Sequence, residues 1–114
     1  MYALFVVLNA IDYLEDILSG FAEVGVSGAT ILDSQGMGSR IVNNRSTNIP
    51  LFGALHMLLE DSHPYSKTIF TVLESEEMVD KTVAVVQEVI GDISETGVGF
   101  MFTVPIGKTY QIGR

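Results

Sequence analysis

The chain has 114 residues, of which 47% are hydrophobic and 18% charged, and its formal net charge is −8. This negative charge repels a phosphate backbone, so nucleic-acid binding is not expected. The absence of cysteine excludes disulfides and thiolate metal sites. The length fits one domain, and the apolar surplus favours burial between subunits. Because the N-terminus has no basic leader and no apolar run reaches the roughly 20 residues of a membrane span, we expect a cytoplasmic homo-oligomer.

The first part of the chain predicts a strand, a helix and a second strand. Tyr2–Leu8 is a continuous apolar run, typical of a strand buried on both faces. Asn9 is a predicted helix N-cap, and Gly25 is placed to end that helix. Gly28–Ser34 then predicts the second strand. The residues predicted to form the apolar face of the helix are Ile11, Leu14, Leu18, Phe21 and Ala22.

The second part repeats this pattern. Lys67–Leu73 predicts a strand, Ser75 an N-cap, Gly91 a helix end and Gly99–Val104 a strand. A further short edge strand is expected at Thr109–Ile112. The residues predicted for the apolar face of this second helix are Met78, Val79, Val83, Val86 and Ile90.

The two parts align at a constant offset of 65 positions. Phe5–Leu8 superimposes on Phe70–Leu73, and Asp12 superimposes on Glu77. Two such βαβ units with right-handed crossovers predict an α+β, ferredoxin-like fold: a four-stranded antiparallel sheet with two helices on one face. We expect a single domain, 1–114, with a long loop, 36–64, between its second and third strands. The apolar sheet face without helices would be covered by other subunits.

Several glycine-containing motifs resemble those of the PII-type signal-transduction proteins, which regulate nitrogen metabolism. The sequence from Gly25 to Ile31 leads into Gly36-Met37-Gly38, and Gly97-Val98-Gly99 precedes a strand that ends at Val104-Pro105. The resemblance implies a homotrimer that binds a small effector, such as an adenine nucleotide, in clefts between subunits. It also implies a loop, the T-loop, that docks onto a transporter or an enzyme. The ligand-binding residues implied by the resemblance are Thr30, Gly36, Met37, Gly38, Arg40, Gly97, Val98 and Gly99.

The chain departs from the family pattern where the family carries cations. Phe100 replaces a lysine, Gln111 and Gly113 replace two arginines, and Tyr65 replaces a further lysine. A triphosphate needs fixed cations or a dense set of amides. We therefore expect ATP to bind weakly or not at all, and the sequence assigns no definite cofactor.

The second half of the predicted loop has an apolar helical pattern, which Pro50 begins and Glu60 ends. It could pack on its own trimer or dock onto a partner protein, and the sequence leaves both alternatives open. The residues of this apolar face, which we name as partner-binding candidates, are Leu51, Phe52, Leu55, Leu58 and Leu59.

The remaining polar residues suggest no chemistry. His56 and His63 lie near Glu60 and Asp61, but their spacing is not one that a helix or strand would converge on a metal. No nucleophile–base arrangement is visible, so neither a metal site nor an enzyme is predicted. Two functions remain: a PII-like regulator that senses an effector, and a ligand-free trimeric interaction module, related in fold to the CutA-type cation-tolerance proteins.

Overall fold

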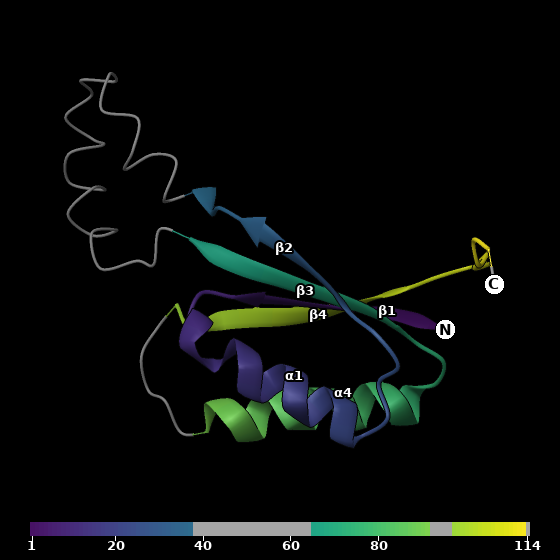
Figure 1. Cartoon of the computed structure of the whole chain (residues 1–114), viewed down its shortest axis with the longest axis horizontal. Coiled ribbons are helices and arrows are strands. Elements are labelled where there is room, and N and C mark those ends of the chain that lie inside the picture. Colours follow the sequence, from purple (N-terminus) through teal and green to yellow (C-terminus); the bar gives the residue numbers. More distant parts are fainter. Residues whose placement is uncertain (38–64, 92–96, 114) are drawn as a thin grey trace.

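The computed structural model describes residues 1–37, 65–91 and 97–113. Their sheet has the strand order β2-β3-β1-β4, and all neighbouring strands are antiparallel. Both helices cover the same face of this sheet (Figure 1). This arrangement confirms the predicted ferredoxin-like fold. The elements in chain order are β1 (Tyr2–Leu8), the 3-10 helix η1 (Ile11–Tyr13), α1 (Leu14–Glu23), β2 (Thr30–Ser34), β3 (Ser66–Leu73), α4 (Glu76–Ile90) and β4 (Gly99–Pro105).

The core lies between the sheet and the two helices. Leu4, Val6 and Leu8 alternate along β1 and are buried, while Phe5 and Val7 between them are only partly buried. This is the period of two that a strand imposes on its side chains. The other hydrophobic residues of the buried cluster are Ile17, Phe21, Ile69, Leu73 and Val86. One face of β1 therefore makes the core, and the other face points away from the helices.

The helices bury equivalent positions of the two units. Ile17 in α1 and Thr82 in α4 are both 0% exposed, and they are separated by the same 65 positions as the rest of the repeat. Thr82 is satisfied because its hydroxyl donates to the carbonyl of Met78 at 2.6 Å. The predicted apolar face of the first helix was wrong at Ile11 and Ala22, which are exposed. Since the helix begins as a 3-10 turn, Ile11 lies outside the stripe that α1 presents to the core.

The predicted helix boundaries at Gly25, Ser75 and Gly91 are confirmed, and one cap is wrong. The hydroxyl of Ser75 accepts from the backbone N–H of Met78 at 3.2 Å, as expected of an N-cap. Gly25, with φ at +95°, ends the first helix in the left-handed region. Asn9 is not a cap, because its side-chain amide donates instead to the carbonyl of Gly97 at 2.9 Å. The asparagine thus joins the end of β1 to the segment before β4.

The edge strand predicted at Thr109–Ile112 is also wrong, because these residues form no strand. After Pro105 the chain runs away from the sheet (Figure 1). Tyr110 and Ile112 are 79% and 98% exposed, so this segment has no strand beside it in the described chain. Nor do the described residues include a helix that is long and apolar enough to cross a membrane.

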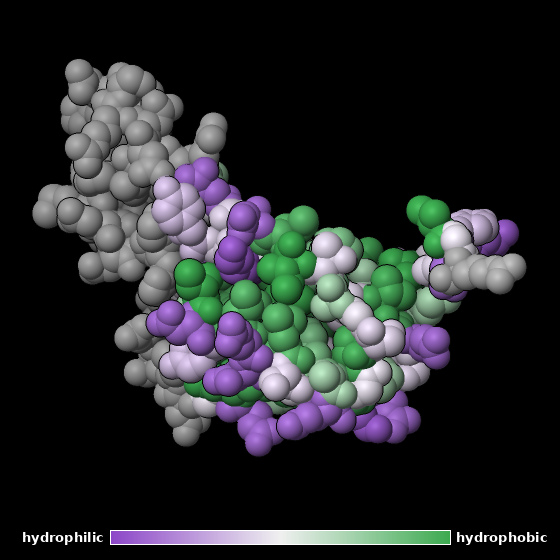
Figure 2. All heavy atoms as spheres, in the orientation of Figure 1, coloured by the Kyte–Doolittle hydropathy of each residue, from purple (hydrophilic) through white to green (hydrophobic). Residues whose placement is uncertain are grey.

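The sheet face opposite the helices, which we call the bare face, is apolar and open. Phe5 and Phe70 lie at its centre and are partly buried. By contrast, hydrophilic residues gather along the outer surface of the helices, below the hydrophobic residues nearer the sheet (Figure 2). An apolar surface of this kind is typical of an interaction site. The exposed hydrophobic residues of the bare face are Leu32, Val72, Phe100, Phe102 and Val104.

Candidate functional site at the loop end of the sheet

The two glycine motifs lie at the same end of the sheet but on opposite edges. Asp33, Lys67, Leu8 and Gly99 stand side by side across the four strands. Gly36 comes just after the end of β2, and Gly99 begins β4. Both motifs therefore lie at this end of the sheet. However, β2 and β4 are the two outer strands, about 14 Å apart at three strand spacings. The motifs therefore do not converge on one ligand within a single subunit.

The second glycine motif is held tightly against the end of β1. The carbonyl oxygen of Val98 accepts hydrogen bonds from the backbone N–H groups of Asn9 and Ala10, at 2.9 and 3.1 Å. Gly99 pairs with Leu8, and a Cβ at this glycine would overlap the carbonyl oxygen of Val7. The glycine is therefore required for β4 to approach β1, which is a structural reason for its presence independent of any ligand.

A set of hydroxyl groups joins β2 to β3 just before the chain enters the predicted loop. The Ser34 hydroxyl lies 2.6 Å from that of Ser66 and 2.9 Å from that of Thr68. Lys67, which lies between Ser66 and Thr68 in sequence, forms an ion pair with Asp33 on the opposite face of the sheet. Sequence reasoning missed these residues, because their proximity depends on the register of β2 against β3. They fix the register at the base of the loop.

The other predicted ligand-binding residues are distributed along β2 and beyond it. Thr30 begins β2 and pairs with Phe70, halfway along β3. It lies about 13 Å along the strand from Ser34. Met37 is 80% exposed beyond the end of β2. The structure thus places Gly36, Met37 and the Gly97–Gly99 motif at the loop end of the sheet, and Thr30 away from it.

Phe100 stands where the sequence resemblance leads one to expect a lysine. Its side chain is 60% exposed and stacks on Phe102, with ring centroids 5.9 Å apart. Val7 lies opposite it on β1. The position next to the second glycine motif therefore contributes an apolar ring to the bare face and no positive charge.

The other predicted site residues lie outside the described part of the chain. They include Gly38 and Arg40 of the ligand-binding set. His56 and His63, for which no metal site was predicted, also lie outside it. Within 1–37, 65–91 and 97–113, no group of three or more histidine, aspartate or glutamate side chains could hold a metal. The partner-binding candidates outside the described residues are Leu51, Phe52, Leu55, Leu58 and Leu59.

The fold and the two glycine motifs define a ferredoxin-like domain with a long connection between its second and third strands, β2 and β3. Residues 3–114 match the family model of the nitrogen regulatory protein P-II. The chain therefore belongs to the P-II family, whose members are regulatory signalling proteins. Among curated proteins, none matches this chain in sequence.

A solved structure shows the same fold. The crystal structure of Arabidopsis thaliana PII bound to citrate matches with a TM-score of 0.60 and 17% sequence identity. The match covers 92% of this chain and 76% of the plant chain. At this identity the similarity establishes the arrangement of the strands and helices, and nothing about a ligand.

Proposed function

We propose that this protein is a trimeric P-II regulator that binds a small effector in the clefts between subunits and acts on a partner protein through its long loop. The observation that carries the proposal is the bare face, where Phe100 is 60% and Phe102 is 42% exposed. Removing such surface from water is worth about 25 cal/mol per Å², so an uncovered face is costly. Self-association covers it without a further component.

Assembly would also solve the problem of the separated glycine motifs. Because β2 and β4 are both outer strands, the Gly36 side of one subunit can lie beside the Gly97–Gly99 side of a neighbour. A cleft at that junction would then have backbone amides on both walls, suited to a small anionic or polar effector. The hydroxyl groups of Ser34, Ser66 and Thr68 would lie near it.

The oligomeric state tests the first part of the proposal. Size-exclusion chromatography with light scattering should give about 37 kDa, three times the 12.4 kDa of one chain. Phe102→Asp should dissociate the assembly, because it places a charge in the covered face. Ile11→Asp is the matched control, since Ile11 is 45% exposed but lies on η1, away from the bare face. A monomeric wild-type protein would end the proposal.

The effector is expected to be less charged than ATP. Phe100 supplies no cation, and Lys67 is already paired with Asp33. Calorimetry with ATP and magnesium should therefore show binding that is weak or absent. A micromolar dissociation constant, about −8 kcal/mol, would contradict this expectation and would point to cations from elsewhere in the assembly.

The loop is proposed to transmit the signal to a transporter or an enzyme. Replacing Leu55 and Leu58 together with Ser distinguishes the two roles that the sequence leaves open. If these leucines pack on their own trimer, the double variant should melt clearly lower, because each buried leucine is worth about 1.5–3 kcal/mol. If they form the docking surface, the melting temperature should hold while partner capture is lost. A variant unchanged in both properties would remove the loop face from the proposal.

A second function, that of a ligand-free trimeric interaction module, is favoured by the phenylalanine at position 100. Such a module would need the trimer and the loop, but no effector. If the protein captures its partner equally well with and without added small-molecule extracts, the ligand-free module is supported. Neither of these two functions involves catalysis. For both, we propose that the protein acts in the cytoplasm.

A further inference from the structure

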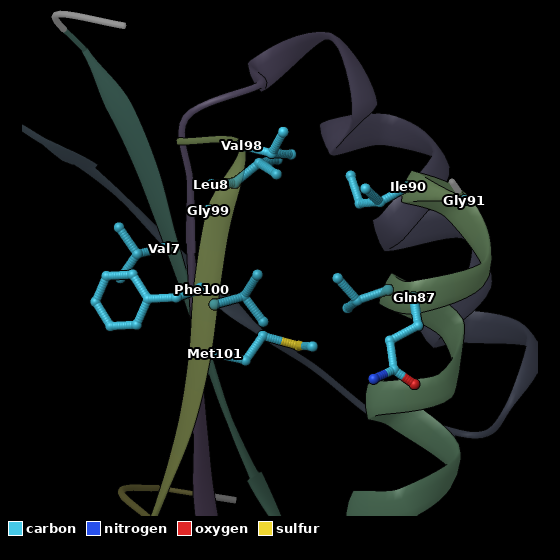
Figure 3. A pocket seen from close by; sticks show the side chains of 11 residues that line it. Val7, Leu8, Gln87, Ile90, Gly91, Val98, Gly99, Phe100 and Met101 are labelled. Atoms are coloured by element: carbon cyan, nitrogen blue, oxygen red, sulfur yellow. The ribbon is translucent and has the colours of Figure 1, made fainter. Parts of the chain in front are cut away.

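A cavity lies on the helix side of the sheet, between α4 and β4. Its volume is about 230 Å³. The side chains of Leu8, Val98 and Met101 approach it from the sheet, and that of Ile90 approaches it from α4 (Figure 3). Gln87 of α4 borders it, with its side chain running along the helix (Figure 3). It lies within one subunit, on the opposite side of the sheet from the bare face. Phe100 and Val7 point away from it, although both border its edge (Figure 3).

The lining offers almost no polar group to a ligand. Among the described residues that line it, none is charged. The carbonyl oxygen of Val98 already accepts from Asn9 and Ala10. That of Gln87 accepts from the backbone N–H of Gly91 at 2.9 Å. Within the described part of the lining, the side-chain amide of Gln87, an exposed residue, is the one polar side chain.

These properties define the occupant. A charged molecule would lose hydration without gaining a counter-charge from the described lining residues, which disfavours its binding. A dry cavity of about 150 Å³ accommodates benzene, so a volume of this order fits one six-membered ring with a small substituent. The sulfur of Met101 points into the cavity, and thioether sulfur makes favourable contacts with aromatic rings (Figure 3).

We propose that the cavity between α4 and β4 is a binding site for a small, uncharged aromatic molecule with at most one hydrogen-bonding group, which Gln87 would recognise. The site does not depend on trimer formation or on an effector between subunits. Its success or failure is therefore separate from that of the proposed function.

The probes are toluene and phenol, which share a ring and differ in one hydroxyl group. Each is titrated into the full-length protein while methyl NMR resonances of Val98, Ile90 and Met101 are followed. We expect saturable shifts of these resonances, with dissociation constants on the order of 1 mM for so few atoms. Absence of saturable shifts for both probes would overturn the proposal.

Two variants locate the site. Val98→Phe should fill the cavity and weaken toluene binding at least tenfold, whereas Val24→Phe should not. Val24 is also half-buried but lies at the end of α1, outside the cavity. Gln87→Leu changes an exposed residue, so it tests the proposal even if Val98→Phe does not fold. It should weaken phenol several-fold and leave toluene binding intact or tighter.

Three other results would also overturn the proposal. Unchanged toluene binding in Val98→Phe would place the probe elsewhere. Binding that appears only in Ile93→Ala would show that the chain's own segment 92–96 occupies the cavity. An affinity that falls as the protein concentration rises would show that a second copy of the chain fills it.

Discussion

Phe5 and Phe70 hold equivalent positions in the two βαβ units and also stand directly opposite each other on β1 and β3. Their ring centroids are 5.7 Å apart. A residue that pairs with its own counterpart marks the axis of an internal two-fold symmetry. Phe102 continues the row on β4, stacked on Phe5 at 4.9 Å. The repeat thus generates the Phe5–Phe70 pair at the centre of the bare face. Phe102 extends this pair on one side only, because the residue that pairs with Phe70 on β2 is Thr30.

The first prediction concerns this row. Phe70→Leu should weaken the assembly, because it removes apolar ring surface that the proposed interface buries, at about 25 cal/mol per Å². The protein should dissociate at a several-fold higher concentration in sedimentation experiments. Ile11→Leu, a change at an exposed apolar residue on η1 away from the bare face, is the control. Equal dissociation of wild-type protein and Phe70→Leu would exclude the aromatic row from the interface.

The second prediction tests the register of α1. Ile17 is 0% exposed, so Ile17→Ala should lower the free energy of unfolding by roughly 2–5 kcal/mol. Ile11→Ala should change it much less, by about 0.5 kcal/mol, because Ile11 is 45% exposed and lies outside the buried core. Chemical denaturation measures both. The reverse order of the two effects would mean that the helix presents its other face to the sheet.

The third prediction separates structural from ligand-binding glycines. Gly99→Ala should cost about 1–3 kcal/mol, because its Cβ would overlap the carbonyl oxygen of Val7 and lie 3.3 Å from the Cα of Leu8. A Cβ at Gly36 meets nothing within 4 Å, so Gly36→Ala should leave stability within about 0.5 kcal/mol. Any loss of effector binding in Gly36→Ala would then report on the ligand directly. A large loss of stability in Gly36→Ala would remove that interpretation.

The fourth prediction concerns the hydroxyl of Tyr2, which donates to Glu76 at 2.9 Å. This hydrogen bond and the negative charge of Glu76 raise the pKa of Tyr2 above its ordinary value of 10.0. The hydrogen bond needs the protonated phenol, so its contribution to stability is present below pH 10 and is lost as the pH rises through the folded-state pKa. Glu76→Ala should lower the Tyr2 pKa in an NMR titration. Glu77→Ala is the control, since Glu77 pairs with Lys81 instead.

The sequence by itself determined the order and type of the main elements. The continuous apolar run Tyr2–Leu8 is long enough for one strand and too short for a core helix, and Ser75 supplies a local N-cap. These signals depend on neighbours in the chain, which is why the four strands, the two helices and the fold that follows from their repeat could be predicted. The bare face followed too, because strands apolar on both sides exceed what two helices can cover.

Tertiary structure decided which residues meet. Asn9 has the chemistry of a cap, yet it binds the carbonyl of Gly97, 88 positions away, because β4 returns beside β1. Thr82 carries no hydrophobic signal. It lies on the core-facing side of α4, where its hydroxyl can be buried because it donates to the carbonyl of Met78. The hydroxyl set at the loop base and the cavity between α4 and β4 depend on strand register and on the distance between layers. Neither quantity is encoded in local periodicity; packing across the whole chain sets both.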